Sequence, residues 1–153
     1  VPPATLAAYG EFHPPRVVHA IRAPDGTFAP QPAPPVRRIP IQHREHWDRT
    51  LEAMVEVVHG ARGTARRIGL GIDYQIGGKT GTAQVFGLKQ EEEYDAEAIA
   101  EKLRDHALFI AYAPAHDPRI AVAVVVENGG SGGAVGSPIA RHILDRYFED
   151  NPL

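Results

Sequence analysis

The sequence predicts an α+β fold in which helices pack against an antiparallel sheet, and three observations lead to this prediction. First, three strand-like segments lie close together in the second half of the chain, at residues 75–85, 107–112 and 119–126. Second, a helical pattern precedes these segments and another follows them, so helices are available to cover a sheet. Third, the short turn-rich link at residues 113–118 favours an antiparallel hairpin between the last two strands.

Proline content divides the 153-residue chain into two unlike parts. Ten of the 14 prolines lie at or before Pro40, so we expect residues 1–45 to form a proline-rich segment of loops and short strands. In this segment the sequence predicts a short helical remnant at residues 5–9, an edge strand at 16–22, a turn at 23–26 and an exposed polyproline-like connection at 30–35. Residues 46–150 are expected to contain the sheet and its packing helices.

A helix is predicted from His46 onward because apolar residues follow one another at helical spacing. Its apolar stripe consists of Trp47, Leu51, Met54, Val55 and Val58. Gly60 is expected to end this helix, as glycine commonly does. A surface helix is expected at residues 95–105, inside an acidic excursion in which residues 91–93 are all glutamate.

The C-terminal part of the chain predicts one more strand and one more helix. The apolar run at residues 120–126 predicts a strand that is buried on both faces of the sheet. A flexible glycine loop is expected at residues 128–133. After it, Ser137 is expected to be the N-cap of the last helix and Pro138 its first residue. The buried stripe of this helix is expected to consist of Ile139, Ile143, Leu144, Tyr147 and Phe148.

Composition argues against several classes of protein. A net charge of −3 and a pI near 6.2 give no support for binding to nucleic acid. The longest apolar run has seven residues, which is too short to span a membrane, and no signal-peptide pattern opens the chain. Because the chain has no cysteine, disulfides and thiolate metal sites are excluded.

The eight histidines do not predict a metal site. His43 and His46, or His116 with Asp117, could supply two ligands, but no third and fourth ligands follow at suitable spacing. We therefore expect surface or core histidines, and neither a metal nor another cofactor. Three arginines are likewise expected to be solvated or salt-bridged rather than to form an anion site, namely Arg62, Arg66 and Arg67.

The most informative stretch is Gly-Gly-Lys-Thr-Gly-Thr-Ala at residues 77–83, for which two chemical readings compete. A Walker A loop requires a glycine where this chain has Asp73, and it must open a helix. Here the motif continues into a strand-like pattern at residues 83–86, so the nucleotide-binding reading fails on both counts. The other reading is the Lys-Thr-Gly element of serine acyltransferases that react with β-lactams. The structural alternative is a lysine that protects a strand edge from aggregation.

Each residue type in the Lys-Thr-Gly element has a chemical reason. A strand at the edge of an active site can pair its backbone with an extended peptide, and Gly81 leaves room where substrate and nucleophile approach. Lys79 places a positive charge that favours a substrate carboxylate, and Thr80 and Thr82 add hydroxyl donors for it. The backbone N–H of Thr82 would face the developing oxyanion. We therefore predict substrate binding by Lys79, Thr80, Gly81 and Thr82, with catalytic roles for Lys79 and the Thr82 N–H.

The surrounding sequence resembles the transpeptidase domain of class B penicillin-binding proteins, and within this family it is most similar to penicillin-binding protein 2. The segments that carry the likeness are Lys-Thr-Gly-Thr-Ala-Gln-Val at 79–85, Phe-Gly-Leu-Lys at 86–89, Leu-Arg-Asp-His at 103–106, Ala-Tyr-Ala-Pro at 111–114, Val-Val-Glu-Asn-Gly-Gly at 125–130 and, upstream, Met54-Val55, Val57-Val58 and Gly-Thr-Ala at 63–65. The likeness covers residues 47–148 well and the first 40 residues loosely. It implies the C-terminal part of a β-lactamase/transpeptidase-like fold.

The resemblance implies a peptidoglycan D,D-transpeptidase that needs no cofactor. In this family a serine attacks a D-Ala-D-Ala stem peptide, forms an acyl-enzyme and passes the acyl group to a neighbouring stem amine, and penicillins acylate the same serine. The implied partners are stem peptides, β-lactams, the rest of the transpeptidase domain, a SEDS-type glycosyltransferase and other proteins of the elongation complex that sets cell shape. The implied location is the periplasmic face of the bacterial inner membrane, with an anchoring N-terminal segment that this chain does not contain.

The chain lacks the nucleophile of this family. Its only serines, Ser131 and Ser137, begin neither a Ser-x-x-Lys tetrad nor a Ser-x-Asn motif, so no activated serine is evident. We expect the remainder of the domain to lie N-terminal to Val1 and the isolated chain to be inactive. Two alternatives stay open: a D,D-carboxypeptidase or β-lactamase-like acylase, and a non-catalytic penicillin-binding sensor or scaffold piece. The long excursion at residues 87–106 argues against a compact β-lactamase.

Overall fold

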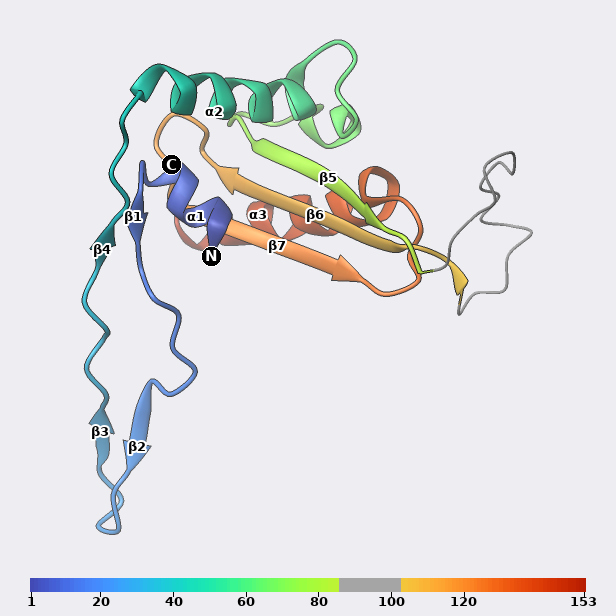
Figure 1. Ribbon diagram of the computed structural model, residues 1–153. Helices are drawn as coiled ribbons and strands as arrows, with labels where there is room; N and C mark the ends of the chain where they lie inside the picture. The colour runs from blue at the N-terminus through green and yellow to red at the C-terminus, as the bar shows by residue number, and fades with distance from the viewer. Residues whose placement is uncertain (86–102) are drawn as a thin grey trace.

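The computed structural model describes residues 1–85 and 103–153, and its centre is a three-stranded antiparallel sheet (Figure 1). The strands are β5 (Gly77–Ala83), β6 (His106–Ala113) and β7 (Ile120–Val126), in the order β5-β6-β7. Their register places Lys79 of β5 opposite Ile110 of β6. The α+β prediction is confirmed, and all three predicted strands are present, although the motif strand is shorter than residues 75–85.

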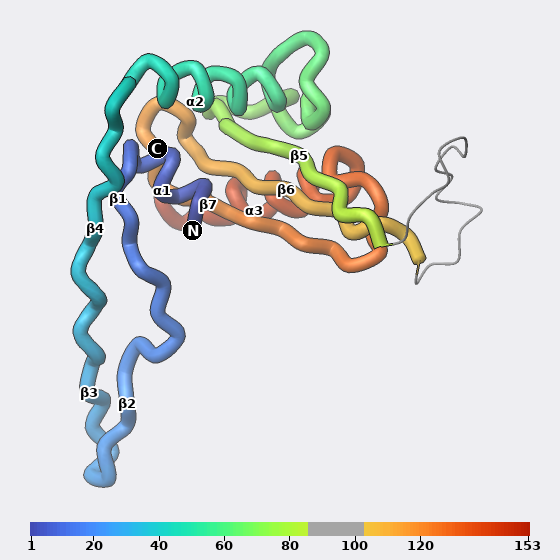
Figure 2. The backbone as a smooth tube through the Cα atoms, viewed as in Figure 1, coloured from blue at the N-terminus to red at the C-terminus, as the bar shows by residue number. Residues whose placement is uncertain are grey.

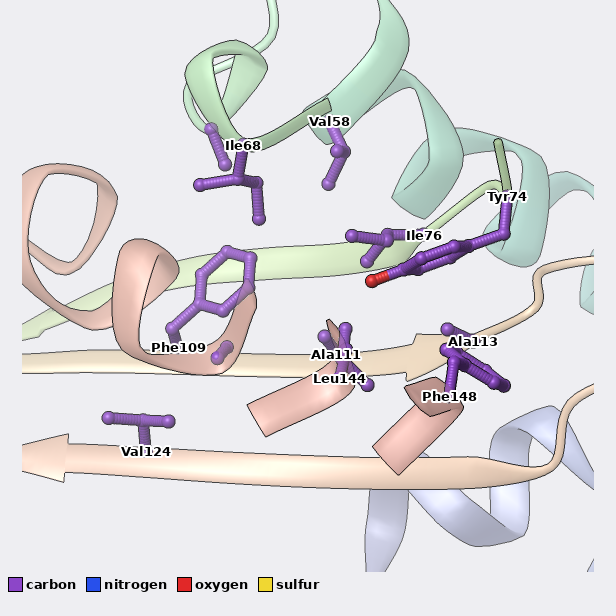
Figure 3. Close-up of a cluster of buried hydrophobic side chains, with 12 residues drawn as sticks. Val58, Ile68, Tyr74, Ile76, Phe109, Ala111, Ala113, Val124, Leu144 and Phe148 are labelled. Carbon is purple, nitrogen blue, oxygen red and sulfur yellow. The ribbon is translucent and has the colours of Figure 1, made fainter. Parts of the chain in front are cut away.

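Two long helices pack against this sheet. α2 (Arg44–His59) lies beside β5, and α3 (Ser137–Asp150) covers one face of the sheet (Figures 1 and 3). The main core lies between α3, the sheet and the end of α2, and it consists of Val58, Ala65, Ile68, Tyr74, Ile76, Phe109, Ala111, Ala113, Val124, Ala140, Leu144 and Phe148. Its three residues from β6 are spaced two apart, as residues on one face of a strand must be.

α2 carries the apolar stripe that the sequence predicts. Of the predicted stripe, three residues are buried (Leu51, Met54 and Val58) and two are partly buried (Trp47 and Val55). Leu51 and Met54 join Tyr112 and Ala7 in a second apolar cluster. Because Tyr112 alternates with the β6 residues of the main core, this cluster lies on the opposite face of the sheet. The helix begins at Arg44, two residues before the predicted start, and ends before Gly60 as predicted.

The prediction that residues 120–126 are buried on both faces of the sheet is wrong. β7 is the last strand of its sheet, and only Val124 in it is buried, whereas Val125 is 62% exposed. Val124 points toward α3, and no described element covers Val125 on the other face. An apolar run therefore indicated a strand correctly, but it could not indicate whether a partner covers the second face.

The start and the buried face of α3 also differ from the prediction. A π turn (Gly132–Gly136) runs directly into α3, so part of the expected flexible loop is ordered and Ser137 is not the N-cap. Instead, the Ser137 hydroxyl donates a hydrogen bond to the Gly133 carbonyl oxygen at 2.7 Å. Pro138 does lie in the first turn.

The face that α3 turns toward the sheet is lined by Ala140, Leu144 and Phe148. Two residues of the predicted stripe, Ile139 and Ile143, are 40% and 42% exposed. The small Ala140 lets the helix approach the sheet closely. The side of α3 that contains Ala140 is therefore buried, and the side that contains the two isoleucines is not. The predicted stripe is therefore confirmed at Leu144 and Phe148 and partly at Tyr147, and it is wrong at Ile139 and Ile143.

The N-terminal segment forms a short helix followed by a long arm. Its elements are α1 (Pro2–Ala7), β1 (Glu11–Phe12), β2 (Ala20–Arg22), β3 (Phe28–Pro30) and β4 (Arg37–Arg38). β1 pairs with β4 and β2 with β3, so residues 11–40 extend away from the sheet as a narrow arm (Figure 2). The predicted helix at residues 5–9 lies further toward the N-terminus, and the predicted strand at 16–22 is reduced to β2.

Two other predictions for this segment have different outcomes. The turn at residues 23–26 is confirmed, because the Ala23 N–H bonds the Thr27 carbonyl and Gly26 adopts a positive φ of 87°. Beyond Pro30 the chain is mostly exposed and outside any strand up to residue 36. The acidic run at residues 91–93 lies outside the described part of the chain. The surface helix expected at residues 95–105 also lies outside it, except for residues 103–105.

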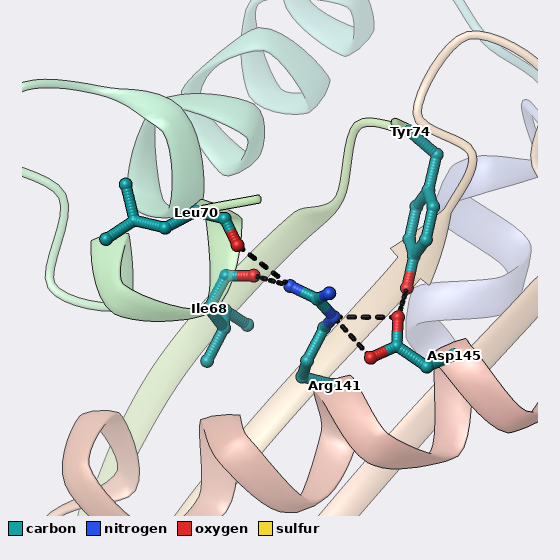
Figure 4. A network of polar contacts seen from close by, with 5 residues as sticks. All are labelled: Ile68, Leu70, Tyr74, Arg141 and Asp145. Carbon is teal, nitrogen blue, oxygen red and sulfur yellow. Dashed lines mark hydrogen bonds and ion pairs between the residues drawn. The ribbon is translucent and has the colours of Figure 1, made fainter. Parts of the chain in front are cut away.

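A polar network ties α3 to the segment that leads into β5 (Figure 4). The Arg141 guanidinium bonds both carboxylate oxygens of Asp145, at 2.7 and 2.6 Å, and donates to the Ile68 carbonyl oxygen at 2.7 Å. The Tyr74 hydroxyl donates to Asp145 at 2.7 Å. Burial, and then the Asp145 carboxylate, raise the pKa of Tyr74 well above its usual value, so the phenol remains a donor. These bonds fix the chain just before the motif strand.

Candidate functional site

The four predicted substrate-binding residues lie together on β5, which is an edge strand of the sheet. Lys79 and Thr82 are exposed, and Thr80 and Gly81 are half-buried. Since successive residues of a strand point to opposite faces, Lys79 and Gly81 share one face of the sheet, and Thr80 and Thr82 share the other. The sheet thus presents an ammonium group and two hydroxyl groups along one exposed strand.

Lys79 is held close to the backbone of its own strand. Its Nζ donates to the Thr80 carbonyl oxygen at 2.6 Å, and no carboxylate in residues 1–85 or 103–153 forms an ion pair with it. An exposed ammonium without a carboxylate partner in this part of the chain keeps its positive charge available for an anionic ligand.

A residue that the sequence reasoning did not select, Thr64, lies beside Thr80. The two hydroxyl oxygens are 3.2 Å apart, which is hydrogen-bonding distance. Thr64 belongs to the loop of residues 60–65 between α2 and the 3₁₀ turn Arg66–Gly69. The sequence feature that could have pointed to Thr64 is Gly-Thr-Ala at 63–65, which is part of the family resemblance. Nothing in the sequence, however, placed Thr64 next to the motif strand.

The π turn lies directly on the backbone of the motif strand and of its neighbour. A Cβ atom at Gly132 would lie 2.1 Å from the Leu108 carbonyl oxygen and 2.4 Å from that of Gly81. A Cβ atom at Gly133 would lie 2.6 Å from the Thr64 carbonyl oxygen. Because no side chain fits at either position, the glycines of the predicted loop serve close backbone packing around Gly81 and Thr64.

His59 joins the end of α2 to the start of the motif strand. Its Nε2 accepts a hydrogen bond from the Ile76 N–H at 3.0 Å, one residue before β5 begins. Burial lowers the pKa of His59 from its ordinary value, against a weaker opposing influence of the nearby Glu56 carboxylate. A protonated Nε2 could not accept this bond, so the junction requires the neutral imidazole.

The free energy of unfolding is therefore expected to fall as the pH drops. The pKa of His59 is lower in the folded chain than in the unfolded chain. The contribution of neutral His59 to the free energy of unfolding is therefore complete above the ordinary histidine pKa of 6.5. It declines as the pH falls from that value through the lowered folded pKa, since the unfolded chain binds the proton first. Thermal unfolding between about pH 7.5 and about pH 5 measures this effect. In His59→Gln, whose amide oxygen can accept the same bond without titrating, the pH dependence should be shallower. Equal slopes in both proteins would contradict this role of His59.

Both serines of the chain form hydrogen bonds with the backbone of the π turn. Ser137 is buried, and its hydroxyl bonds the Gly133 carbonyl. Ser131 is exposed, and its Oγ accepts from the Ala134 N–H at 3.4 Å. The one lysine in the described ranges, Lys79, bonds neither of them.

The other residues that the sequence analysis considered do not gather into a site. The rings of His43 and His46 are tilted by 37° to each other with centroids 5.1 Å apart, and His43 contacts Glu45. Within residues 1–85 and 103–153, no three histidine, aspartate or glutamate side chains are grouped so that they could hold a metal ion. Three arginines, Arg62, Arg66 and Arg67, are exposed. None of the described helices is both long and apolar enough to cross a bilayer.

Comparisons with known proteins agree on one family. Residues 3–145 match the family model described as the penicillin binding protein transpeptidase domain. The chain is 47% identical over 129 residues to the peptidoglycan D,D-transpeptidase MrdA of Escherichia coli K12, which covers 82% of this chain and 20% of that protein. The chain thus spans about a fifth of the length of this curated relative.

Solved structures resemble the chain over nearly its whole length. The Pseudomonas aeruginosa PBP2 structure in complex with WCK 5153 has a TM-score of 0.68 and 38% identity, covering 95% of this chain and 28% of that one. The imipenem acyl-enzyme of penicillin-binding protein A from Mycobacterium tuberculosis has a TM-score of 0.65 and 29% identity, covering 94% of this chain and 28% of that one.

Proposed function

Because this chain belongs to the penicillin-binding protein transpeptidase domain family, and to its PBP2 (MrdA) group, we propose that it is the C-terminal part of a peptidoglycan D,D-transpeptidase. We name that longer protein the parent enzyme. The observation that carries the proposal is the position of Lys79, Thr80, Gly81 and Thr82 on an exposed edge strand. In this role β5 binds the stem peptide, while the serine nucleophile belongs to a part of the parent enzyme outside this chain.

The proposed chemistry assigns one task to each group on β5. The stem peptide extends along the free edge of β5 and pairs with its backbone. Lys79, which lacks an ion-pair partner among the described residues, attracts the terminal carboxylate of the peptide or of a β-lactam. Because Thr80 and Thr82 lie on the opposite face from Lys79, we place the carboxylate at the free edge of β5. There the two hydroxyl groups can donate hydrogen bonds to it from one side, and the ammonium can approach it from the other.

The oxyanion that forms during acylation is assigned to the N–H of Thr82. Alternate residues of an antiparallel strand direct their backbone groups to the same side. We place the Thr80 carbonyl, which accepts from Lys79 Nζ at 2.6 Å, and the Thr82 N–H together at the free edge of β5. A backbone N–H at that edge can stabilise the negative oxygen without reorganisation, because the strand already holds it in place.

The exposed apolar face of the sheet supports a covering partner that carries the serine. Lys79 shares this face with Ile110 and Leu108, which are only half-buried, and with the exposed Val125. α1 and the second apolar cluster cover this face around Tyr112, whereas no described element covers it around Val125. We propose that the preceding part of the transpeptidase domain packs on this face and brings its serine next to Lys79.

The partners and the location follow from the same assignment. The proposed ligands are peptidoglycan stem peptides and β-lactams, and the relative from M. tuberculosis forms an acyl-enzyme with imipenem. The parent enzyme is proposed to act at the periplasmic face of the inner membrane, together with a SEDS-type glycosyltransferase and other proteins of the elongation complex. No cofactor is needed for serine acyl transfer.

Turnover of a stem pentapeptide by the parent enzyme tests the reaction class. With a second stem peptide as acceptor, we expect a cross-linked product that has lost one D-alanine, detected by mass spectrometry. Protein that has first been incubated with benzylpenicillin is the control and should form no product. Release of a tetrapeptide without cross-linking would instead indicate a D,D-carboxypeptidase, and no turnover with a penicillin adduct still forming would indicate a sensor.

A further inference from the structure

We propose that Thr64 is a positioning residue that orients the Thr80 hydroxyl toward the carboxylate of the bound stem peptide or β-lactam. This inference rests on the proposed function, because it concerns the same substrate-binding strand. Its starting point is the distance of 3.2 Å between the two hydroxyl oxygens, which joins a loop after α2 to the motif strand 16 residues later.

The loop holds Thr64 firmly from both neighbouring residues. The Gly63 N–H bonds the Gly60 carbonyl at 3.0 Å, and the Ala65 N–H bonds the Val57 carbonyl, also at 3.0 Å. Ala65 is only 1% exposed. Thr64 itself is exposed, but the backbone on either side of it is fixed by these hydrogen bonds and by the burial of Ala65.

The methyl group of Thr80 faces the π turn. Its methyl carbon lies 3.4 Å from the position that a Cβ atom would take at Gly133, in the π turn. Because threonine is branched at Cβ, a methyl group that faces the π turn leaves the hydroxyl directed away from it, toward Thr64. Gly133 also approaches the Thr64 carbonyl so closely that no side chain fits there. The π turn thus contacts both members of the hydroxyl pair.

The hydrogen bond between the two hydroxyl groups can be donated in the direction that favours carboxylate binding, from Thr64 to Thr80. Each hydroxyl carries one proton and can accept further hydrogen bonds. When Thr64 donates to Thr80, the proton of Thr80 is left free for a carboxylate oxygen, and the first bond polarises the second. Without the Thr64 hydroxyl, the proton of Thr80 is free to rotate toward other acceptors, and this ordering is lost.

The test compares acylation of the parent enzyme by benzylpenicillin and by its methyl ester, which lacks the free carboxylate. Thr64→Val removes the hydroxyl while keeping the shape of the side chain. It is expected to lower the second-order rate constant for benzylpenicillin by about tenfold, and that for the ester by less than about twofold. Thr64→Ser keeps the hydroxyl and should restore most of the rate with benzylpenicillin.

Thr50→Val is the matched control, because Thr50 is an exposed threonine of α2 whose hydroxyl bonds the His46 carbonyl of the same helix, at 2.8 Å. It should leave both rates unchanged. An equal loss with penicillin and ester in Thr64→Val would mean a structural role and would overturn the inference, as would unchanged rates. Wild-type protein that forms no adduct with benzylpenicillin would overturn the proposed function itself, and a failure confined to the Thr64 variants would leave that function intact.

Discussion

Lys79→Ala in the parent enzyme is expected to slow acylation by benzylpenicillin by roughly a hundredfold, the range for loss of a hydrogen bond to a charged group. Lys79 is the one lysine of the described chain and is free of carboxylate partners there, so the proposed carboxylate site has no second ammonium group. The measurement is the rate of adduct formation at several penicillin concentrations, followed by intact mass.

In the 153-residue chain by itself, the same substitution should hardly change the thermal unfolding temperature, because the Lys79 side chain is exposed there and forms no ion pair within the described ranges. Arg67→Ala, which removes an exposed positive charge from the 3₁₀ turn, serves as the control for net charge. It should be acylated at the wild-type rate. Wild-type acylation of Lys79→Ala would show that the ammonium has no part in binding the carboxylate.

Gly132→Ala is expected to lower the free energy of unfolding by about 3 kcal/mol, at the upper end of the range for overpacking. The new methyl group would lie 2.1 Å from the Leu108 carbonyl oxygen and 2.4 Å from that of Gly81. Both obstacles are backbone atoms of paired strands, so neither can rotate aside as a flexible side chain could. The π turn would have to lift from the sheet, and α3 continues directly from that turn.

Gly81→Ala provides the matched control for stability. A Cβ atom at Gly81 would lie 3.2 Å from the Cβ of Leu108, so the two strands would have to separate by only a few tenths of an ångström, far less than the overlap at Gly132 demands. Urea denaturation of both variants should show a large loss for Gly132→Ala and a small one for Gly81→Ala. Similar losses in the two variants would mean that the π turn does not depend on contact with the sheet backbone.

Local patterns in the sequence predicted a substantial part of this fold. The stripe that ends at Val58 identified α2, because apolar residues at helical spacing must share one side of a helix. The Lys-Thr-Gly stretch identified β5, because its continuation toward Val85 lacks any helical pattern. The predicted site residues are consecutive on one strand, so the sequence alone indicated that they lie close together.

What the sequence could not predict depends on contacts between distant segments. Thr64 meets Thr80 only because the loop after α2 folds back against β5. The buried side of α3 depends on how closely Ala140 lets the helix approach the sheet, and two isoleucines suggested another side. The exposure of Val125 depends on whether another element covers it, which the composition of one strand does not encode.

The central claim is that this chain supplies the substrate-binding strand of an acylating enzyme whose nucleophile lies outside residues 1–153. The most direct test is intact-mass analysis after incubation with benzylpenicillin, of this chain alone and of the parent enzyme. We expect no adduct on the chain alone, and one adduct on the parent enzyme at a serine that precedes this segment. A stoichiometric adduct on the 153-residue chain by itself would contradict the account, because it would require a nucleophile among these residues.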